Sequence, residues 1–189
     1  MTLVASAFPG CGKSTFVKTH PEVSDSDSSQ FDKMGFPSNY CSHIRNRMVA
    51  DKLTLVSSHD IVRQALVKSK IDYILVYPAL ECKDEYLKRY AKRGSELKFI
   101  DLLERNWDDW IKDCQAQEGC THVVLQPGQF LADVIEIRDG EFQVKGTGPD
   151  DLEEVNIADV LKKDGDASDY PIDHEPNPLG AYLDKQDGR

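Results

Sequence analysis

The run DYILVYP at residues 72–78 restricts the possible folds of this chain most, because it is almost continuously apolar. A strand that is apolar on both sides suits a parallel sheet with both faces covered, whereas a half-exposed strand alternates with polar residues. Shorter strand-like runs occupy residues 2–5, 22–24, 52–58 and 121–126, and helical segments separate them. Strands that alternate with helices predict an α/β protein with three layers and a five-stranded parallel sheet.

Helical periodicity and turn residues predict the remaining elements. Helices are expected at residues 13–20, 38–51, 59–69, 83–92, 95–114 and 129–135. The helix at 95–114 carries a stripe of apolar side chains at helical spacing, which predicts a core position. This stripe consists of Ile100, Leu103, Trp107, Trp110, Ile111 and Cys114. The segment IEIRDGEFQV at 135–144 predicts a hairpin with Asp139 and Gly140 at its turn. We therefore expect a core at residues 1–135 and a hairpin with a C-terminal extension at 136–189.

The negative charge of the chain is concentrated at one end. The formal net charge is -10, and residues 150–189 hold twelve Asp or Glu against four Lys or Arg. The first 149 residues are therefore close to neutral, so the acidic composition alone does not argue against a phosphorylated ligand there. We predict that the acidic segment is a peripheral extension that is partly disordered.

The thiols and the hydropathy suggest where the protein resides. Five cysteines are dispersed without a C-x-x-C pair, which favours reduced thiols in the cytoplasm and does not support a zinc site. No apolar run reaches the length of about 18 residues that a membrane helix needs. The first residues also lack the pattern of a secretory signal. We expect a cytoplasmic protein with no membrane partner.

The loop AFPGCGKS at residues 7–14 lies between the first strand and the first helix. Glycine at positions 10 and 12 lets backbone N–H groups turn toward phosphate oxygens, Lys13 supplies a charge, and the Ser14 hydroxyl suits a magnesium ion. Ala7 stands where this loop usually has glycine, and we expect that change to be tolerated. The sequence predicts that ATP binds at Gly10, Cys11, Gly12, Lys13, Ser14 and Thr15.

Several segments together resemble one family of enzymes. FPGCGKST, the acidic SDSD after the second strand and a basic helix before the last strand resemble the P-loop nucleotide and polynucleotide kinases over residues 1–135. SSHDIVRQAL, VYPALECKDEYLKRYAKRG and LLERNWDDWI are similar to small bacteriophage-encoded proteins of the nucleoside monophosphate kinase type. The resemblance implies a P-loop kinase fold, ATP and Mg2+ as cofactors, transfer of the γ-phosphate, and the cytoplasm of a bacteriophage host.

Asp25 and Asp27 follow or end the second strand, from which both carboxylates can reach the loop. In polynucleotide kinases an aspartate at this place takes a proton from the acceptor hydroxyl, so the resemblance makes either residue a candidate general base. Asp27, with Ser14, is also a candidate magnesium ligand. The competing interpretation is a helix cap or a solvated turn, since Ser-Asp-Ser-Asp is typical of turns.

Acceptor-binding candidates lie between the second and third strands. The resemblance places an acceptor phosphate near the helix that carries Arg45 and Arg47, which point about 200° apart so that only one of them faces the site. Phe31 and Tyr40 are candidates to stack on a base, although packing is the more common role of such residues. His59 follows the third strand and either contacts the acceptor or begins a helix.

A basic segment at about 82–95 is the candidate lid. Residues 83–93 hold five basic side chains against two acidic ones, and Arg89 and Arg93 share a helical face. The resemblance implies that lid arginines neutralise charge during phosphoryl transfer, and a solvated helix face is the alternative. It also places Pro127 and Gly128 beside the adenine.

These features predict an ATP-dependent phosphotransferase that acts on a (deoxy)nucleoside monophosphate. A kinase for a hydroxyl of DNA or RNA is the first alternative, although the near-neutral core argues against the wide basic groove that a polymer favours. The second alternative is a nucleotide-binding ATPase or regulator whose acidic extension binds a protein partner.

Overall fold

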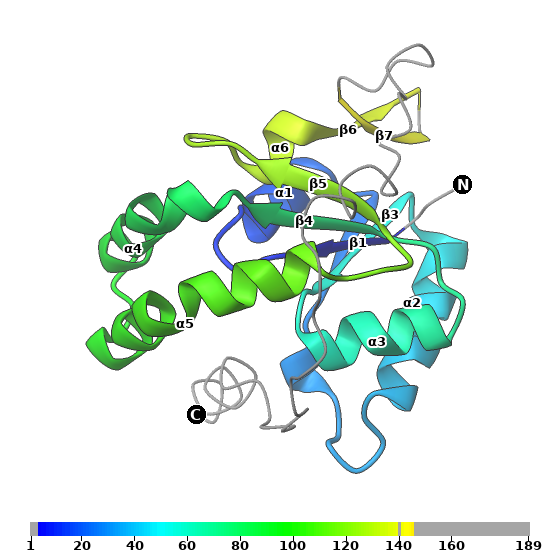
Figure 1. The fold of residues 1–189 in the computed structure, drawn as a ribbon. Helices are drawn as coiled ribbons and strands as arrows, with labels where there is room; N and C mark the ends of the chain where they lie inside the picture. The colour runs from blue at the N-terminus through cyan, green and yellow to red at the C-terminus, as the bar shows by residue number, and fades with distance from the viewer. Residues whose placement is uncertain (1–3, 140, 146–189) are drawn as a thin grey trace, which may run out of the picture.

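The computed structural model describes residues 4–139 and 141–145 and contains a five-stranded, entirely parallel sheet (Figure 1). The strands are β1 (Val4–Ala7), β2 (Val23–Ser26), β3 (Leu53–Ser57), β4 (Ile74–Pro78) and β5 (Thr121–Leu125). Their order across the sheet is β2-β3-β1-β4-β5. The predicted α/β architecture with a five-stranded parallel sheet is confirmed, and the carboxyl ends of all five strands meet at one edge.

Helices cover both faces of this sheet (Figure 1). They are α1 (Lys13–Thr19), α2 (Ser38–Ala50), α3 (Asp60–Lys68), α4 (Lys83–Lys92), α5 (Leu97–Gln115) and α6 (Leu131–Val134), with short 3-10 turns η1 (Ser28–Gln30) and η2 (Leu80–Cys82). Helices α2 to α5 bury side chains in one core, and α1 and α6 contribute to the core on the opposite face. The molecule therefore has three layers, as predicted.

The alternation of side chains in β4 explains why its sequence is continuously apolar. Leu75 and Tyr77 belong to the core beneath α2 to α5, whereas Ile74 and Val76 belong to the core on the α1 side. Each of these side chains is 3% exposed or less, so neither face of the strand meets solvent. A polar residue at any of them would be buried without a guaranteed partner.

Aromatic residues fasten α5 to the loop that follows β1. The Trp107 ring lies 5.8 Å from Phe8 and 5.2 Å from Tyr86, and its Nε1 donates a hydrogen bond of 2.8 Å to the Leu80 carbonyl. The predicted apolar stripe of α5 is buried at Leu103, Trp107, Trp110, Ile111 and Cys114, while Ile100 is half-buried against the same core. The stripe is thus core, as its spacing predicted.

The predicted hairpin is also present. Strands β6 (Ile135–Arg138) and β7 (Glu141–Val144) pair antiparallel, and Ile135 is buried in the core on the α1 side. Asp139 takes a positive φ of 54°, which fits a tight turn between the strands. Gly140 and the acidic extension lie outside the described residues.

Several predicted boundaries were wrong. β1 continues through Ala7 instead of ending at Ala5, because Ser6 and Ala7 pair with both β3 and β4. β2 extends to Ser26, so Asp25 lies within the strand and pairs in register with Leu55. The helix predicted at 129–135 is only Leu131–Val134, since Ile135 already belongs to β6.

Hydropathy within the described ranges gives one further result. None of the helices in residues 4–139 and 141–145 is long and apolar enough to cross a membrane.

Replacing Trp107 by Ala tests the aromatic link between α5 and the loop after β1. Removal of a fully buried Trp leaves a cavity, so we expect the free energy of unfolding to fall by about 3–5 kcal/mol. Met34 is 96% exposed, and we expect Met34→Ala to change the free energy of unfolding by no more than about 0.5 kcal/mol. Urea unfolding followed by far-ultraviolet circular dichroism measures both, and equal losses would contradict the packing role of Trp107.

Candidate functional site

A cavity of about 810 Å³ opens at the carboxyl edge of the sheet. Ligands of open α/β sheets bind at this edge, and the volume lies within the usual range for small-molecule sites. The lining comes from the loop after β1 with the start of α1, from the ends of β2 and β3 with η1, from α4, the segment after it and the start of α5, and from the loop after β5. Its residues are Pro9, Gly10, Gly12, Lys13, Ser14, Thr15, Asp25, Ser26, Asp27, Ser28, Ser29, Ser57, His59, Arg89, Tyr90, Lys92, Arg93, Ser95, Phe99 and Phe130.

The floor of the cavity is the glycine-rich loop, residues 8–12. Phe8 is buried beneath it, and the Phe8 N–H donates a hydrogen bond of 2.8 Å to Val76 of β4. At the other end, the Cys11 carbonyl accepts a hydrogen bond of 2.8 Å from the Leu131 N–H. Gly10 has a φ of 84°, a conformation that other residues adopt only with strain. The loop is therefore held at both ends, with its turn made by glycine.

Lys13 folds back over this loop from the start of α1. Its Nζ donates a hydrogen bond of 2.8 Å to the carbonyl of Ala7, so the ammonium group lies above the end of β1. Ala7 is a strand residue without a positive φ, and its buried methyl group packs in the core on the α1 side. The alanine at the first position of the AFPGCGKS segment is accommodated for this reason.

Cys11 lies within the loop but is inaccessible. Its side chain is fully buried, and burial raises the pKa of the thiol above its ordinary value. The residue was predicted to bind ATP as part of the loop. Cys11 is not part of the cavity lining, so its thiol does not face the space that a ligand would fill.

Asp25 and Asp27 both line the cavity but differ in their surroundings. Burial raises the pKa of Asp25, the nearby Lys13 charge partly offsets this, and Asp27 adds to it. The Asp25 side chain remains accessible because it borders the cavity, yet protein atoms surround it on the other sides. Asp27 accepts a hydrogen bond of 2.9 Å from the Ser29 N–H and so caps η1. The cap predicted as an alternative is therefore real for Asp27.

Arg89 is fixed in a dense set of contacts. Its guanidinium lies 3.8 Å from the Phe130 ring centre and 4.7 Å from that of Tyr86, and it pairs with Glu85. It also donates to the carbonyl of Gln129 at 2.9 Å and to that of Gly10 at 3.4 Å. Arg89 thus joins α4, the glycine-rich loop and the loop after β5.

Glu85 reinforces this junction. Its carboxylate accepts a 2.8 Å hydrogen bond from the Gly128 N–H in addition to the pairing with Arg89. The Gly128 hydrogen bond and the guanidinium of Arg89 lower the pKa of Glu85, despite some opposing burial. The carboxylate therefore stays charged while it holds the loop after β5 against α4.

Arg93 differs from Arg89 although the sequence placed both on one helical face. It follows α4, lies exposed at the cavity wall, and holds its guanidinium 5.3 Å from the Tyr90 ring centre. Lys92 lines the same wall. Of the two predicted lid arginines, Arg93 is the one whose charge faces an open space.

Four of the predicted acceptor-binding residues lie away from the cavity. Tyr40 is fully buried, and its hydroxyl donates a 2.6 Å hydrogen bond to the Ser26 carbonyl, which ties α2 to β2. Phe31 packs at 4.8 Å against Tyr40. Arg45 donates to the Ser69 carbonyl at 2.8 Å, and Arg47 pairs with Asp51 at 2.7 Å on its own helix. These contacts hold all four side chains outside the lining of this cavity.

The remaining predicted site residues are His59 and, in the loop after β5, Pro127 and Gly128. His59 lines the cavity and also precedes α3, so both of its predicted roles agree with its position. Pro127 and Gly128 lie outside the lining, and Phe130 from the same loop lies within it. Sequence reasoning missed Tyr90, Phe99 and Phe130. The sequence did contain a signal for Tyr90. Tyr86 and Tyr90 are four residues apart, as are the neighbouring Arg89 and Arg93, so the two pairs lie along the same helix.

Oxygen ligands in the cavity are compatible with magnesium. Within the described part of the chain, no three His, Cys, Asp or Glu side chains gather as a metal site. Magnesium commonly takes only one or two protein ligands and completes its shell with water and phosphate oxygens. The Ser14 hydroxyl and the Asp27 carboxylate line the same cavity and fit that requirement.

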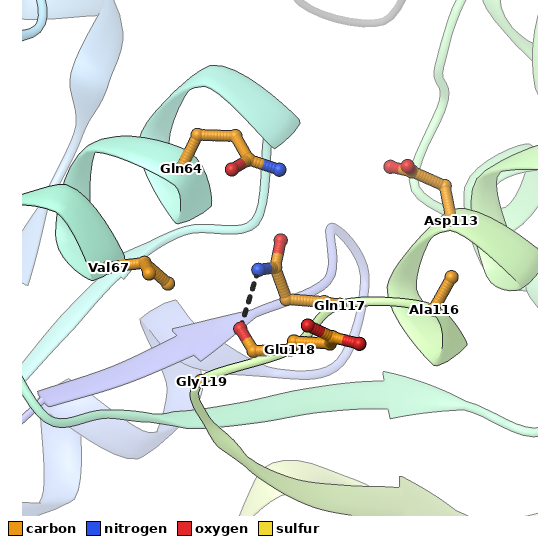
Figure 2. Close-up of a pocket in the computed structure, with 7 residues that line it drawn as sticks. All are labelled: Gln64, Val67, Asp113, Ala116, Gln117, Glu118 and Gly119. Atoms are coloured by element: carbon orange, nitrogen blue, oxygen red, sulfur yellow. Dashed lines mark hydrogen bonds between the residues drawn. The ribbon is translucent and has the colours of Figure 1, made fainter.

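A second cavity, of about 430 Å³, lies at the opposite edge of the sheet, before the start of β5 (Figure 2). Its lining consists of Gln64, Val67, Asp113, Ala116, Gln117, Glu118 and Gly119. Gln117 donates a 2.8 Å hydrogen bond to the Glu118 carbonyl, while nearby Arg63 is buried and paired with Asp113. Since the lining offers carboxylates and amides and no cation, this cavity is unsuited to phosphate.

Comparison with known proteins adds no assignment. No protein-family model matches the chain, and no curated protein matches it.

Replacing Gly10 by Ala tests how closely the glycine-rich loop packs. A β-carbon there would lie 3.1 Å from the Tyr90 ring and would also require the left-handed backbone. Gly94 has a similar φ of 78° with nothing within 4 Å, so Gly94→Ala measures the backbone cost alone, about 1–2 kcal/mol. We expect a larger loss of unfolding free energy in Gly10→Ala, measured by urea unfolding. A loss no greater than that of Gly94→Ala would contradict the contact.

Proposed function

We propose that this chain is an ATP-dependent phosphotransferase whose glycine-rich loop and Lys13 hold the polyphosphate of the nucleotide. The observation that carries the proposal is a single cavity that combines this loop, the lysine at the start of α1 and the Asp25 carboxylate. Backbone N–H groups of a glycine-turned loop and a lysine ammonium are complementary to phosphate oxygens. The resemblance to P-loop kinases agrees with this reading.

Each side chain has a role that its surroundings support. Lys13 neutralises phosphate oxygens above the loop, and Arg93 with Lys92 adds positive charge from the α4 wall. Asp25 accepts the proton of the acceptor group as the acceptor oxygen bonds to the γ-phosphorus and the bond to the leaving ADP oxygen breaks. Magnesium, held by Ser14 and Asp27, would supply further neutralisation of the phosphates. Arg89 acts indirectly, because its contacts keep the loop in place.

The raised pKa of Asp25 suits a base in this position. A carboxylate with an ordinary pKa is a weak proton acceptor at neutral pH, and burial makes it stronger. Lys13 offsets part of the increase, and the remaining rise in pKa makes Asp25 a better proton acceptor than a solvated aspartate. This balance between burial and a neighbouring cation is typical of catalytic carboxylates.

The placement of cations bears on the acceptor. The sequence favoured a (deoxy)nucleoside monophosphate, whose phosphate Arg45 or Arg47 was to bind. Those arginines lie elsewhere, and the β2–β3 side of the cavity is lined by Asp25, Ser26, Asp27, Ser57 and His59. An acceptor phosphate next to two carboxylates is repelled, whereas a neutral hydroxyl is not. This observation favours an acceptor that offers a hydroxyl, such as a nucleoside or a hydroxyl group of DNA or RNA, over a monophosphate.

An acceptor screen with magnesium and ATP labelled at the γ-phosphate tests the function. The acceptors are the nucleoside monophosphates, the nucleosides, and DNA and RNA with free hydroxyl ends. We expect label on a hydroxyl acceptor and none with Lys13→Ala, while Lys18→Ala on the same helix retains activity. Label on monophosphates alone would restore the first expectation for the acceptor. Phosphate release without any labelled acceptor would instead indicate an ATPase.

Amide substitutions separate the two aspartates. Asp25→Asn removes the proposed base, and we expect the transfer rate to fall by about 10²–10⁴-fold. Asp27→Asn keeps a side-chain oxygen that caps η1, so fold stability should be unchanged. The transfer rate of Asp27→Asn should fall less than that of Asp25→Asn, and added magnesium should restore part of it. Steady-state kinetics over a range of magnesium concentrations measures both, and equal effects would contradict the division of roles.

The pH dependence provides a second test of Asp25. A base must be unprotonated, and its pKa is raised, so kcat/KM should begin to fall at a higher pH than the ordinary aspartate value of about 3.9 implies. In Asp25→Asn this acidic limb should disappear from the residual rate. An unchanged limb in the variant would assign it to another group.

A further inference from the structure

Tyr90 of α4 lies against the glycine-rich loop, a contact that was not predicted from the sequence. Its side chain is 4% exposed and lines the cavity. A β-carbon at Gly10 would lie 3.1 Å from the Tyr90 hydroxyl oxygen. The phenol therefore lies directly against the turn of the loop, where glycine leaves room for it.

The hydroxyl of Tyr90 is buried and has no hydrogen-bond partner among the residues that the structure describes. Buried hydroxyl groups in proteins nearly always have a partner, and each exception requires an explanation. Burial raises the pKa of Tyr90 above its ordinary value, so the group remains a neutral O–H that can donate. A donor without an acceptor thus lies at the wall of a cavity that contains Lys13 and Arg93.

Neighbouring side chains hold the ring in this place. The Phe99 ring packs edge-on at 4.9 Å, and the Arg93 guanidinium lies 5.3 Å from the ring centre on the cavity side. The hydroxyl is therefore held against the loop by a packed ring.

Tyr86 provides an internal comparison one helical turn away. Its hydroxyl is also buried without a described partner, but Tyr86 packs between Phe8 and Trp107 and is not part of the cavity lining. The two phenols share burial and helix, and only Tyr90 borders the space next to the loop. An anion in the cavity can therefore complete the hydrogen bond of Tyr90 and not that of Tyr86.

We propose that the Tyr90 hydroxyl donates a hydrogen bond to a phosphate oxygen of the polyphosphate bound at the glycine-rich loop. This inference rests on the proposed function and adds a nucleotide-binding residue outside the loop. It also gives α4 a second task, because the helix that fixes the loop through Arg89 also supplies a donor to the ligand.

The test compares Tyr90→Phe with Tyr86→Phe by titration calorimetry in the presence of magnesium. The probes are a non-hydrolysable ATP analogue and inorganic tripolyphosphate. A hydrogen bond to a charged oxygen corresponds to about a tenfold or greater change in affinity. We expect Tyr90→Phe to bind both probes at least about tenfold more weakly and Tyr86→Phe to bind them as the unmodified chain does. Thermal unfolding of both variants verifies that the phenylalanine ring keeps the packing.

The two probes separate failure of this inference from failure of the proposed function. If the unmodified chain binds both probes and Tyr90→Phe binds them equally well, Tyr90 has no such role and the function stands. Equal weakening in both variants also overturns the inference, since it indicates a packing effect. Binding of tripolyphosphate alone, weakened by Tyr90→Phe, supports Tyr90 and overturns the nucleotide. Binding of neither probe overturns both.

Discussion

The position of the glycine-rich loop depends on the burial of Phe8. This residue follows β1 directly, hydrogen-bonds to β4 through its backbone, and packs its ring against Tyr86 and Trp107. The loop is therefore fastened to β4 on one side and to α4 and α5 on the other. A loop with left-handed glycines has many accessible conformations in isolation, and this contact selects one of them. The cavity keeps its shape because its floor is anchored in the core.

Helix α4 extends this anchoring to the wall of the cavity. Arg89 lies between two aromatic rings and bonds to backbone carbonyls of two loops, which compensates the cost of removing its charge from water. Besides Arg89, whose donors are engaged by the protein, the cations of the cavity lining are Lys13, Lys92 and Arg93. They come from the start of α1 and from α4 with the segment after it, whereas Asp25 and Asp27 come from the end of β2 and the residue after it. The proposed phosphate donor and hydroxyl acceptor fit this distribution of charge.

Local sequence patterns predicted much of the fold. The continuous apolar run in β4 predicted burial on both faces, and the stripe on α5 predicted its packing surface. The ends of the strands were harder to predict, because Ser6 and Ala7 belong to β1 only through their pairing with β3 and β4. Within the site, Asp25 and Asp27 both line the cavity. They differ because only Asp27 accepts a hydrogen bond from the Ser29 N–H, a contact that the sequence pattern does not reveal.

Local patterns were enough to predict the layered parallel sheet and the glycine-rich loop before Lys13, because apolar periodicity and a glycine followed by a lysine are properties of a few neighbouring residues. Tertiary packing, in contrast, determines which distant side chains share the cavity. Arg45 finds the Ser69 carbonyl and Arg47 finds Asp51, so neither reaches the site that their spacing allowed. Tyr90 reaches it because α4 packs across the loop from far along the chain. Such choices depend on competition among partners that meet only after folding, and no local pattern encodes that competition.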